Sequence, residues 1–592
     1  MSLSWIDAAT FFGFLALVVV VSLRASRRER DSEDYFLAGR RLGWCLIGFS
    51  LIASNISTEH FVGMAGTAFG RVGLAIASYE WMSAVTLVIV AWWLLPKFLR
   101  AGIYTMPEFL EYRYDKGART IMAVYLMVLY VVALLATVLY SGAQGIDGIF
   151  DFTGYLADRY GMPVEEAHDT AILLGVWFIG IVAAIYTIYG GLKAVVWSDL
   201  LQGGALLLGG AIVFWIGLHL CGGGRLMPGG GVEGGSLLEG WRSFTDHNAT
   251  KLHVVLPWND PDVPWLAVFV GGLWIPNLFY WGLNQFITQR TLGARSLEEG
   301  QKGIFLACVF KLLIPFLIVM PGIMAFQLFG DEILAKAGGD FSKAGERAYP
   351  FLIAKTMPVF LRGIMLAALA GAVMSTFNSG INSASTIFTI DLYKGYLNPD
   401  PGPEREVRVG QIATAVIALA ACLIGPLPGE FRGVFNYIQE IWGFISPGIV
   451  AAFLGGLWFS KAPPLAGRLA LLLSPLLYAV CRVPRWVFES VYEVQVRDGV
   501  RLLYERRAPD VLAPVGGFRQ ALFDFNNWAF LHHMGLIFLV LCAIMALVAL
   551  RRPLPSPVVY PRSRVDVRVR PVIYLQGGAI LVATAFLYFL FW

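Results

Sequence analysis

Residues 47–66 read IGFSLIASNISTEHFVGMAG, and this stretch decides the fold. It is apolar and long enough to enter a bilayer, but a polar run from Asn55 to His60 interrupts it. A continuous membrane helix gains little from such a run. A helix broken at this point uses it, because freed backbone carbonyls can bind a cation and the side chains can line a cavity. The stretch therefore favours a discontinuous membrane helix with a site at its break, the alternative being a polar kink that only packs against neighbouring helices.

The composition of the whole chain agrees with a membrane protein. Of its 592 residues, 57% are hydrophobic and only 15% are charged, whereas soluble domains carry about 25% charged residues. This excludes a disordered chain, a collagen and an ordinary soluble enzyme, and it favours an all-α polytopic membrane protein. The net charge of +4 gives no support to a nucleic-acid partner.

Apolar segments of spanning length recur along the chain. We expect about fourteen transmembrane helices, at residues 8–23, 47–70, 75–95, 119–149, 169–190, 195–219, 265–285, 303–328, 359–391, 408–426, 431–459, 465–482, 528–550 and 572–591. The units 47–219 and 265–459 each hold five of these spans. Because five is odd, the second unit would be inverted relative to the first, which is a common transporter architecture. The remaining segments are an N-terminal helix and linker (1–46), an outer loop (220–264) and C-terminal helices (460–592).

The orientation follows from the basic residues. Arg24 and Arg27 come after the first apolar run, whereas a cleavable signal peptide carries its positive charge before it. We therefore expect a permanent first helix with its N-terminus outside. The loops that are then internal carry basic residues, among them Arg290 and Arg295, as the positive-inside rule requires. This orientation places both termini on the extracytoplasmic side of the cell membrane. It also makes the charged segment 483–527 an outer insertion.

Two charged residues fall inside predicted spans. Glu80 lies in AIASYEWMSA and Lys311 in ACVFKLLIPF. A mid-membrane charge costs about 2.5–3.5 kcal/mol on insertion scales, so each needs a partner or a wet cavity. They could line a binding site or form a structural pair, or Lys311 could snorkel to the interface. Gln439 and Glu440 could likewise cap a broken helix.

The segment GAVMSTFNSGINSAS, at residues 371–385, is dense in hydroxyl groups. Small residues permit close helix packing, which is one interpretation. The other is that Ser375 and Thr376 supply hard oxygen ligands, which suit alkali and alkaline-earth cations rather than zinc or copper. No Walker A, HExxH, GxSxG or CxxC motif occurs, so the sequence supports neither an ATP-driven pump nor an enzyme. Six cysteines are too few for a disulfide scaffold, and pairing of Cys221 with Cys481 stays open.

Several ordered motifs resemble the sodium:solute symporter family, in particular its sodium/sugar branch and the bacterial sodium/galactose transporters. They are DYFLAGRRLGW (34–44), LIASNISTEHFVGMAG (51–66), IASYEWMSA (76–84), IYTMPEFLEYRY (103–114), IYGGLKAVVWSDLLQ (188–202), NQFITQRTLGA (284–294) and NSASTIFTIDLY (382–393). The resemblance extends from about Asp34 to Trp458. It implies the leucine-transporter-type fold, an inverted repeat of five plus five helices.

The resemblance also implies site residues. A sodium ion would be bound by Ala53, Ile56, Ala372, Ser375 and Thr376, and Asp199 would take part in coupling, although Asp199 could also be a helix N-cap. The sugar-binding positions are Asn55, His60, Glu80, Ser83, Asn277, Lys311 and Gln439. The gates match Met64, Tyr79 and Phe435 on the outside, and Tyr280 with Trp281 on the inside. Two positions depart from the bacterial galactose transporter, which has Ser at Thr376 and Gln at His60; animal sodium/glucose transporters have His at the latter.

These residue types suit an uncharged sugar, because they combine several hydrogen-bonding groups with an aromatic face for stacking. A carboxylate would favour an arginine, and we expect none in the cavity. The sequence therefore predicts a sodium-coupled symporter of a glucose- or galactose-class sugar that works by alternating access. Alternatives are symport of an inositol, a nucleoside or sialic acid, and a sugar-binding sensor or channel. Proton coupling through His60 and Glu80 is a further alternative.

Overall fold

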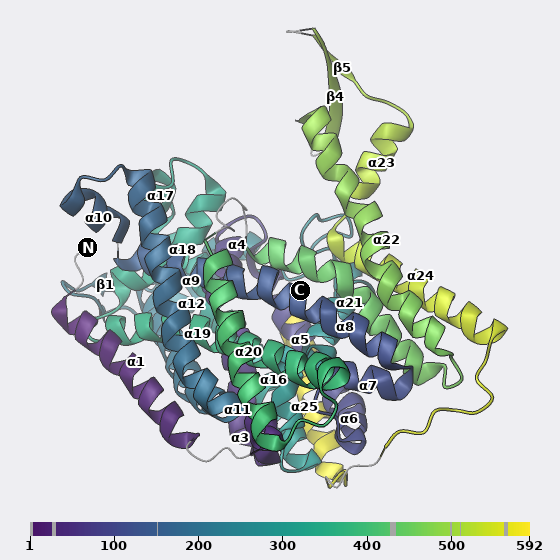
Figure 1. The fold of residues 1–592 in the computed structure, drawn as a ribbon. Coiled ribbons are helices and arrows are strands. Elements are labelled where there is room, and N and C mark those ends of the chain that lie inside the picture. Colours follow the sequence, from purple (N-terminus) through teal and green to yellow (C-terminus); the bar gives the residue numbers. More distant parts are fainter. Residues whose placement is uncertain are drawn as a thin grey trace.

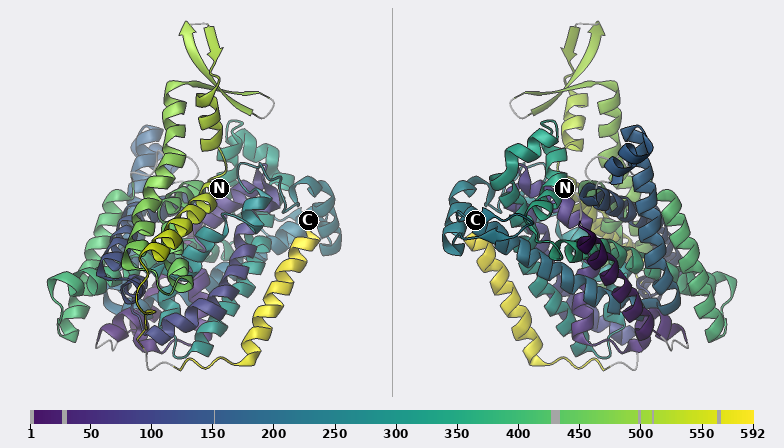
Figure 2. Two further views of the ribbon diagram at one scale, coloured as in Figure 1. Left: turned by 90° about the vertical axis from the view of Figure 1, so that its right-hand side faces the viewer. Right: turned by 90° about the vertical axis from the view of Figure 1, so that its left-hand side faces the viewer.

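The computed structural model describes residues 4–26, 31–150, 152–426, 434–497, 500–508, 511–561 and 566–592. These residues form a bundle of long helices, from one side of which a small β-sheet projects (Figures 1 and 2). We call this the hairpin side. The predicted all-α membrane fold is confirmed, since twelve helical stretches in the described part of the chain are long and apolar enough to cross a membrane.

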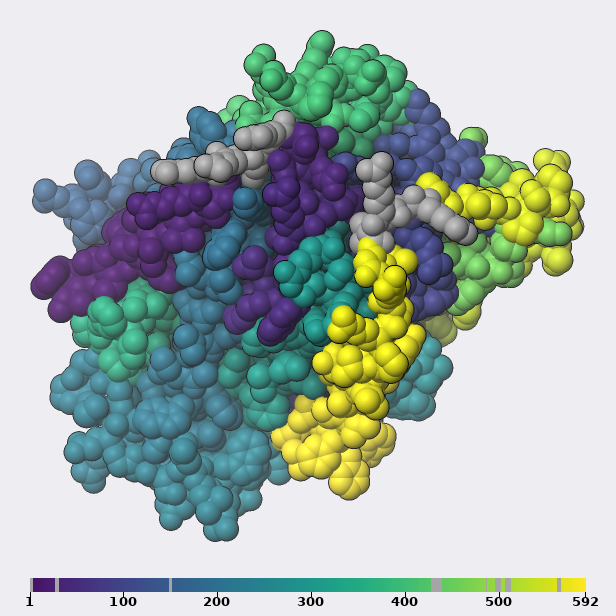
Figure 3. All heavy atoms as spheres, turned by 90° about the horizontal axis from the view of Figure 1, so that it is seen from below, coloured from purple at the N-terminus to yellow at the C-terminus, as the bar shows by residue number. Residues whose placement is uncertain are grey.

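The first half of the bundle begins with α1 (Trp5–Ala25), which runs along its surface (Figure 3). The elements that follow are α2 (Ser32–Leu37), η1 (Ala38–Arg40), α3 (Trp44–Asn55), η2 (Glu59–Met64), α4 (Ala65–Phe69), η3 (Gly73–Ala77), α5 (Ser78–Ile89), η4 (Val90–Leu94), α6 (Leu95–Ala101), α7 (Met106–Arg113), α8 (Lys116–Leu129), η5 (Tyr130–Leu135), α9 (Ala136–Phe150), α10 (Phe152–Tyr160) and α11 (Val164–Cys221). Here η marks 3-10 and π turns.

The second half contains β1 (Arg225–Leu226), β2 (Val232–Glu233), α12 (Leu237–His247), η6 (Ala249–Lys251), α13 (Trp265–Phe269), α14 (Trp274–Leu278), η7 (Phe279–Leu283), α15 (Gln285–Leu292), α16 (Leu297–Ile314), η8 (Pro315–Val319), α17 (Met320–Lys336), α18 (Phe341–Thr356), α19 (Leu361–Ile387), η9 (Phe388–Leu397), α20 (Pro403–Ile424) and α21 (Val434–Trp458). The C-terminal part contains α22 (Pro464–Val491), β3 (Glu493–Arg497), β4 (Val500–Ala508), β5 (Val511–Pro514), α23 (Phe518–Asn526), α24 (Phe530–Arg551) and α25 (Pro571–Leu590).

Two features account for the difference between the twelve long helices and the fourteen predicted spans. The predicted spans 169–190 and 195–219 lie in one element, α11, which is kinked at Gly191 (φ 49°, ψ −146°). A side chain at Gly191 would collide with the carbonyl oxygen of Tyr35, so only glycine fits this close, left-handed turn. The predicted span 47–70 is divided into α3, η2 and α4. The count of fourteen and the five-plus-five repeat remain predictions.

The core of the bundle is α19, in which every residue from Met365 to Ile387 is buried. It packs against α11, α3 and α15, so its hydroxyl-rich face meets polar residues from three other elements. This arrangement places the segment 371–385 at the centre of the molecule rather than at a lipid-facing surface.

The predicted outer insertion 483–527 begins later than expected, because α22 continues as a helix to Val491. A three-stranded antiparallel sheet in the order β3-β4-β5 follows, and then α23. The N-terminal end of α1 and the C-terminal end of α25 both point towards the hairpin side (Figure 2). Cys221 and Cys481, whose pairing stayed open, are both free thiols.

Candidate functional site

The first core helix is broken where the polar run predicted a break. Helix α3 ends at Asn55, Ile56 is extended (φ −75°, ψ 118°), and a π turn begins at Glu59. The hydroxyl of Ser57 accepts a hydrogen bond from the Glu59 amide at 3.2 Å, which caps the second piece. Polar residues therefore end one helical piece and begin the next, and the prediction of a discontinuous helix is confirmed.

A second helical break lies at the end of the predicted span 265–285, whose apolar helical stretch runs from Trp265 to Leu283. The π turn η7 ends at Leu283, Asn284 is extended (φ −87°, ψ 121°), and α15 begins at Gln285. The Asn284 side chain accepts hydrogen bonds from the Phe286 amide at 3.2 Å and from the hydroxyl of Tyr130. The asparagine caps α15 and thereby stabilises the break.

Next to both breaks lies a polar cluster centred on Lys311. Its ammonium group donates to Glu80 Oε2 at 2.6 Å and to the Asn55 side-chain oxygen, and it lies 4.7 Å from the centre of the Trp281 ring. Asn55 Nδ2 in turn donates to the Tyr280 hydroxyl at 3.2 Å. Four elements, α3, α5, α16 and η7, thus meet at a buried site with one positive and one negative charge.

His60 is a further polar side chain of this cluster. Its Nδ1 accepts a hydrogen bond from the Ser57 amide at 3.4 Å, and its Nε2 lies 3.5 Å from Glu80 Oε1. An acceptor at Nδ1 leaves Nε2 as the donor of a neutral imidazole. His60 therefore has polar contacts on both sides of its ring and does not merely pack against a neighbouring helix.

The remaining predicted sugar and gate residues lie around the cluster. Ser83 Oγ donates to Asn277 Oδ1 at 3.1 Å, and the buried Asn277 Nδ2 has no hydrogen-bond partner among the described residues. Gln439 lies half-buried near the start of α21, which packs against both η2 and η7. Of the gate residues, Met64, Tyr79 and Trp281 are buried and Tyr280 is partly buried, while the side chain of Phe435 lies outside the described residues.

Of the predicted sodium ligands, those on α19 lie beside the end of α3. Thr376 Oγ1 donates to the carbonyl oxygens of Ser54 and Ala372 at 3.0 and 3.1 Å, which joins α19 to the end of α3. Ser375 Oγ donates to Asp199 Oδ1 at 2.5 Å. These contacts bring two hydroxyl oxygens next to backbone carbonyl oxygens. Across the described ranges, no group of three or more His, Cys, Asp or Glu could hold a metal ion.

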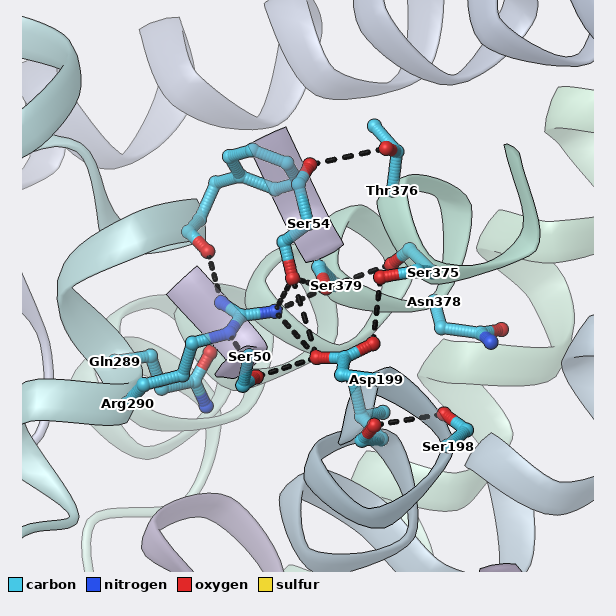
Figure 4. A network of polar contacts seen from close by, with 12 residues as sticks. Ser50, Ser54, Ser198, Asp199, Gln289, Arg290, Ser375, Thr376, Asn378 and Ser379 are labelled. Carbon is cyan, nitrogen blue, oxygen red and sulfur yellow. Dashed lines mark hydrogen bonds and ion pairs between the residues drawn. The ribbon is translucent and has the colours of Figure 1, made fainter. Parts of the chain in front are cut away.

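Beside these hydroxyls lies a buried ion pair (Figure 4). Asp199 Oδ2 is 3.6 Å from Arg290 Nη2 and accepts hydrogen bonds from Ser54 at 3.2 Å and from Ser50. Arg290 also donates to Ser50 Oγ at 2.6 Å, to the Phe286 carbonyl at 2.5 Å, and to Ser54 and Ser379. The network joins α3, α11, α15 and α19, and the predicted sodium ligand Ser375 is part of it through its hydrogen bond to Asp199.

The comparison with known proteins decides the family. The profile of the sodium:solute symporter family matches residues 35–464. A sodium/glucose cotransporter of Vibrio parahaemolyticus is 41% identical over 473 residues, which is 78% of this chain and 82% of that protein. The chain belongs to the sodium:solute symporter family.

Other members of the symporter family are also similar to this chain. A symporter of Escherichia coli, YidK, is 36% identical, covering 79% of this chain and 77% of its own. A human sodium/myo-inositol cotransporter is 31% identical over 82% of this chain and 70% of its own. The fold matches an outward-open, substrate-bound Na⁺-coupled sialic acid symporter with a TM-score of 0.70, at 18% identity, over 94% of this chain and 99% of that one.

Arg290 is the site residue of this symporter that sequence reasoning missed. The sequence placed it in an inner basic loop; instead its side chain is 1% exposed inside the bundle beside Asp199. The alternative role of Asp199 as a helix N-cap is also wrong, because Asp199 lies within α11 well past the kink at Gly191. One signal was available: Arg290 stands between Gln289 and Thr291, in a polar run unlike a lysine- and arginine-rich loop.

Proposed function

We propose that this symporter carries a glucose- or galactose-class sugar together with sodium by alternating access. The observation that carries the proposal is the position of the Lys311 cluster beside the break of the first core helix, within the same helix assembly as the Ser375 and Thr376 hydroxyls. The cluster pairs one ammonium with one carboxylate and includes the phenol ring of Tyr280. A neutral polyol suits such a site, because its hydroxyl groups can both donate and accept and its apolar face can stack on a ring.

In this proposal the sugar replaces hydrogen bonds that the side chains make with one another. The hydrogen bonds from Lys311 to Glu80 and to Asn55 are charge-assisted. In the sugar complex, sugar hydroxyl groups would accept from the Lys311 ammonium and donate to the side-chain oxygens of Glu80 and Asn55. The unpaired Asn277 amide supplies a further donor. The sugar-binding residues are those implied by the resemblance: Asn55, His60, Glu80, Ser83, Asn277, Lys311 and Gln439.

For sodium we propose the carbonyl oxygens of Ala53, Ile56 and Ala372 and the hydroxyl oxygens of Ser375 and Thr376. Since both hydroxyls donate their protons elsewhere, to Asp199 and to a carbonyl, their lone pairs are available for a cation. An ion at this place would hold α19 against the broken helix and so favour the state that accepts sugar. Its loss to the other side would release that contact, which couples the two solutes.

The electrochemical gradient is sufficient for accumulation. A membrane potential contributes about 2.3 kcal/mol per charge per 100 mV, and a tenfold sodium gradient adds about 1.4 kcal/mol. At one sodium ion per sugar these values limit accumulation to roughly 500-fold.

The proposed topology follows from the basic loops and the positive-inside rule. The hairpin side, with both termini and the 483–527 insertion, faces the outside, and residues 47–219 and 265–459 form the two inverted repeats. Accessibility of single engineered cysteines to an impermeant maleimide in right-side-out vesicles tests this: labelling at residue 505 and protection at residue 405 are expected, and the reverse pattern refutes it.

Transport of an inositol is the second candidate, because relatives at 30–31% identity are sodium/myo-inositol cotransporters. Uptake of labelled glucose, galactose and myo-inositol into proteoliposomes, with sodium or potassium outside, separates the candidates. Sodium-driven accumulation of a hexose supports the proposal. Accumulation of inositol alone favours the second candidate, and binding without accumulation indicates a sensor or channel.

A further inference from the structure

Helix α22, which leads into the hairpin, contacts α21 along one face. Ser474, Tyr478 and Arg482 are spaced four residues apart and therefore lie on the same side of α22. Each contacts α21 at a different height, Ser474 at Phe444 and Gly448, Tyr478 at Gly443, and Arg482 at Glu440. Because α21 also carries Gln439, this interface reaches the proposed sugar site.

The contact at Ser474 involves two backbone groups of α21. Ser474 Oγ accepts a hydrogen bond from the Gly448 amide at 3.0 Å and donates one to the Phe444 carbonyl at 2.9 Å. These two backbone groups would otherwise be partners in the helix. Pro447, which has no amide hydrogen, precedes Gly448. A proline and a side-chain hydroxyl bonded to backbone groups both weaken a helix locally, so the backbone of α21 is held less firmly by its own hydrogen bonds at Pro447 and Gly448.

Nearer the N-terminus of α21, Tyr478 and Arg482 contact Gly443 and Glu440. The Tyr478 ring lies so close to Gly443 that a Cβ there would be 2.3 Å from the ring carbon Cζ. Arg482, only 4% exposed, forms an ion pair with Glu440. It also donates to the carbonyl oxygens of Asn526 and Trp528 at 3.1 and 3.2 Å. One guanidinium therefore joins the start of α21 to the base of the insertion.

We propose that Arg482 is a positioning residue for sugar binding: through Glu440 it fixes the part of α21 that carries Gln439. Successive helix residues point about 100° apart, so holding Glu440 against α22 sets the direction of its neighbour. The insertion thereby anchors the part of α21 that carries Gln439. This inference rests on the proposed function, in which Gln439 binds sugar.

The alternative is that Arg482 only fastens the insertion to the bundle. In that case Arg482 contributes to stability, and Glu440 is a dispensable partner. The two cases differ in the Michaelis constant for sugar of Glu440 variants. Because the Glu440 side chain is 28% exposed, its removal leaves Arg482 with two carbonyl partners and need not unfold the chain.

The experiment measures initial rates of sodium-driven uptake of labelled glucose and galactose into proteoliposomes containing the full-length protein. Glu440→Ala is expected to raise the sugar KM roughly two- to twelvefold, the effect of one weakened hydrogen bond. Sodium activation at saturating sugar should stay as in the parent. Glu440→Gln should restore the parent KM, because the amide oxygen still accepts from Arg482. Arg485→Met, which removes an i,i+4 pair with Glu489 on the same helix, is the matched control and should change nothing.

Arg482→Met and the double variant Glu440→Ala/Arg482→Met complete a cycle. If Arg482 acts through Glu440, the KM of the double variant equals that of the Glu440→Ala variant. An unchanged KM for Glu440→Ala, or independent effects of the two changes, overturns the inference. If Arg482→Met does not fold, the Glu440 variants decide alone. Failure of the proposed function would look different, because the parent protein itself would then take up neither hexose in response to sodium.

Discussion

Glu80 and Lys311 form a buried ion pair, and each is proposed to contact the sugar. Their side chains are 4% and 1% exposed, and Lys311 Nζ lies 2.6 Å from Glu80 Oε2. Removing one partner leaves the other charge buried, which in soluble proteins costs about 3–5 kcal/mol of stability, whereas neutralising both is often harmless. We therefore expect Glu80→Gln and Lys311→Met each to abolish uptake and to lower stability by about that amount.

The double variant Glu80→Gln/Lys311→Met separates the structural from the functional role. Since no unpaired charge remains, its thermal stability in detergent should return to near that of the parent. Uptake of glucose and galactose should remain absent, because the sugar still lacks both charged partners. Glu298→Gln/Lys302→Met, which removes a partly exposed i,i+4 pair on the same helix as Lys311 and weakens the contact of Glu298 with Arg570, is the matched control. Recovery of uptake in the buried double variant would show that the pair is only structural and would refute the reasoning.

Three further predictions concern the sodium site, His60 and the hairpin-side loops. Ser375→Ala and Thr376→Val should each raise the sodium concentration for half-maximal uptake, with little change in sugar affinity at saturating sodium; activation curves that overlay the parent's would contradict the site. His60→Gln should retain uptake and shift the glucose-to-galactose preference about two- to twelvefold, whereas His60→Leu should abolish it; unchanged selectivity with Gln and tolerance of Leu would count against sugar contact. Burial raises the pKa of Asp260, but hydrogen bonds from Arg71 and two backbone amides outweigh this effect, so the pKa is lowered. The ionised Asp260 should therefore stabilise this loop fully above pH 3.8, and this contribution should be lost as the pH falls further. Thermal melts from pH 3 to 6 of the parent and of Asp260→Asn test this, and parallel curves would refute it.

The sequence predicted local features well where a polar group stands alone in an apolar run. The polar residues from Asn55 to His60 have no place in a continuous membrane helix, so the break at Ile56 could be foreseen. Glu80 and Lys311 each had to find a partner, and pairing was among the weighed outcomes. These inferences depend only on the free-energy cost of burying a charge or an unpaired backbone polar group in the membrane.

Features that depend on distant partners could not be predicted in this way. Arg290 is buried because Asp199 and three serines from two other helices surround it. The polar run around Arg290 sets it apart from a basic loop, but it does not identify these partners. The break at Asn284 depends on the Tyr130 hydroxyl, more than 150 residues away. The contact of Arg482 with Glu440 likewise arises only once α21 and α22 pack together.

Sodium-driven accumulation of a hexose is the central claim, and uptake by the purified protein tests it most directly. Proteoliposomes are loaded with potassium and diluted into labelled glucose or galactose, with either sodium or potassium outside. The account predicts transient accumulation of one or both sugars above equilibrium with sodium outside, and loss of that accumulation with potassium outside or in the Thr376→Val variant at low sodium. Equal uptake in sodium and potassium, or equilibration without accumulation, would contradict it.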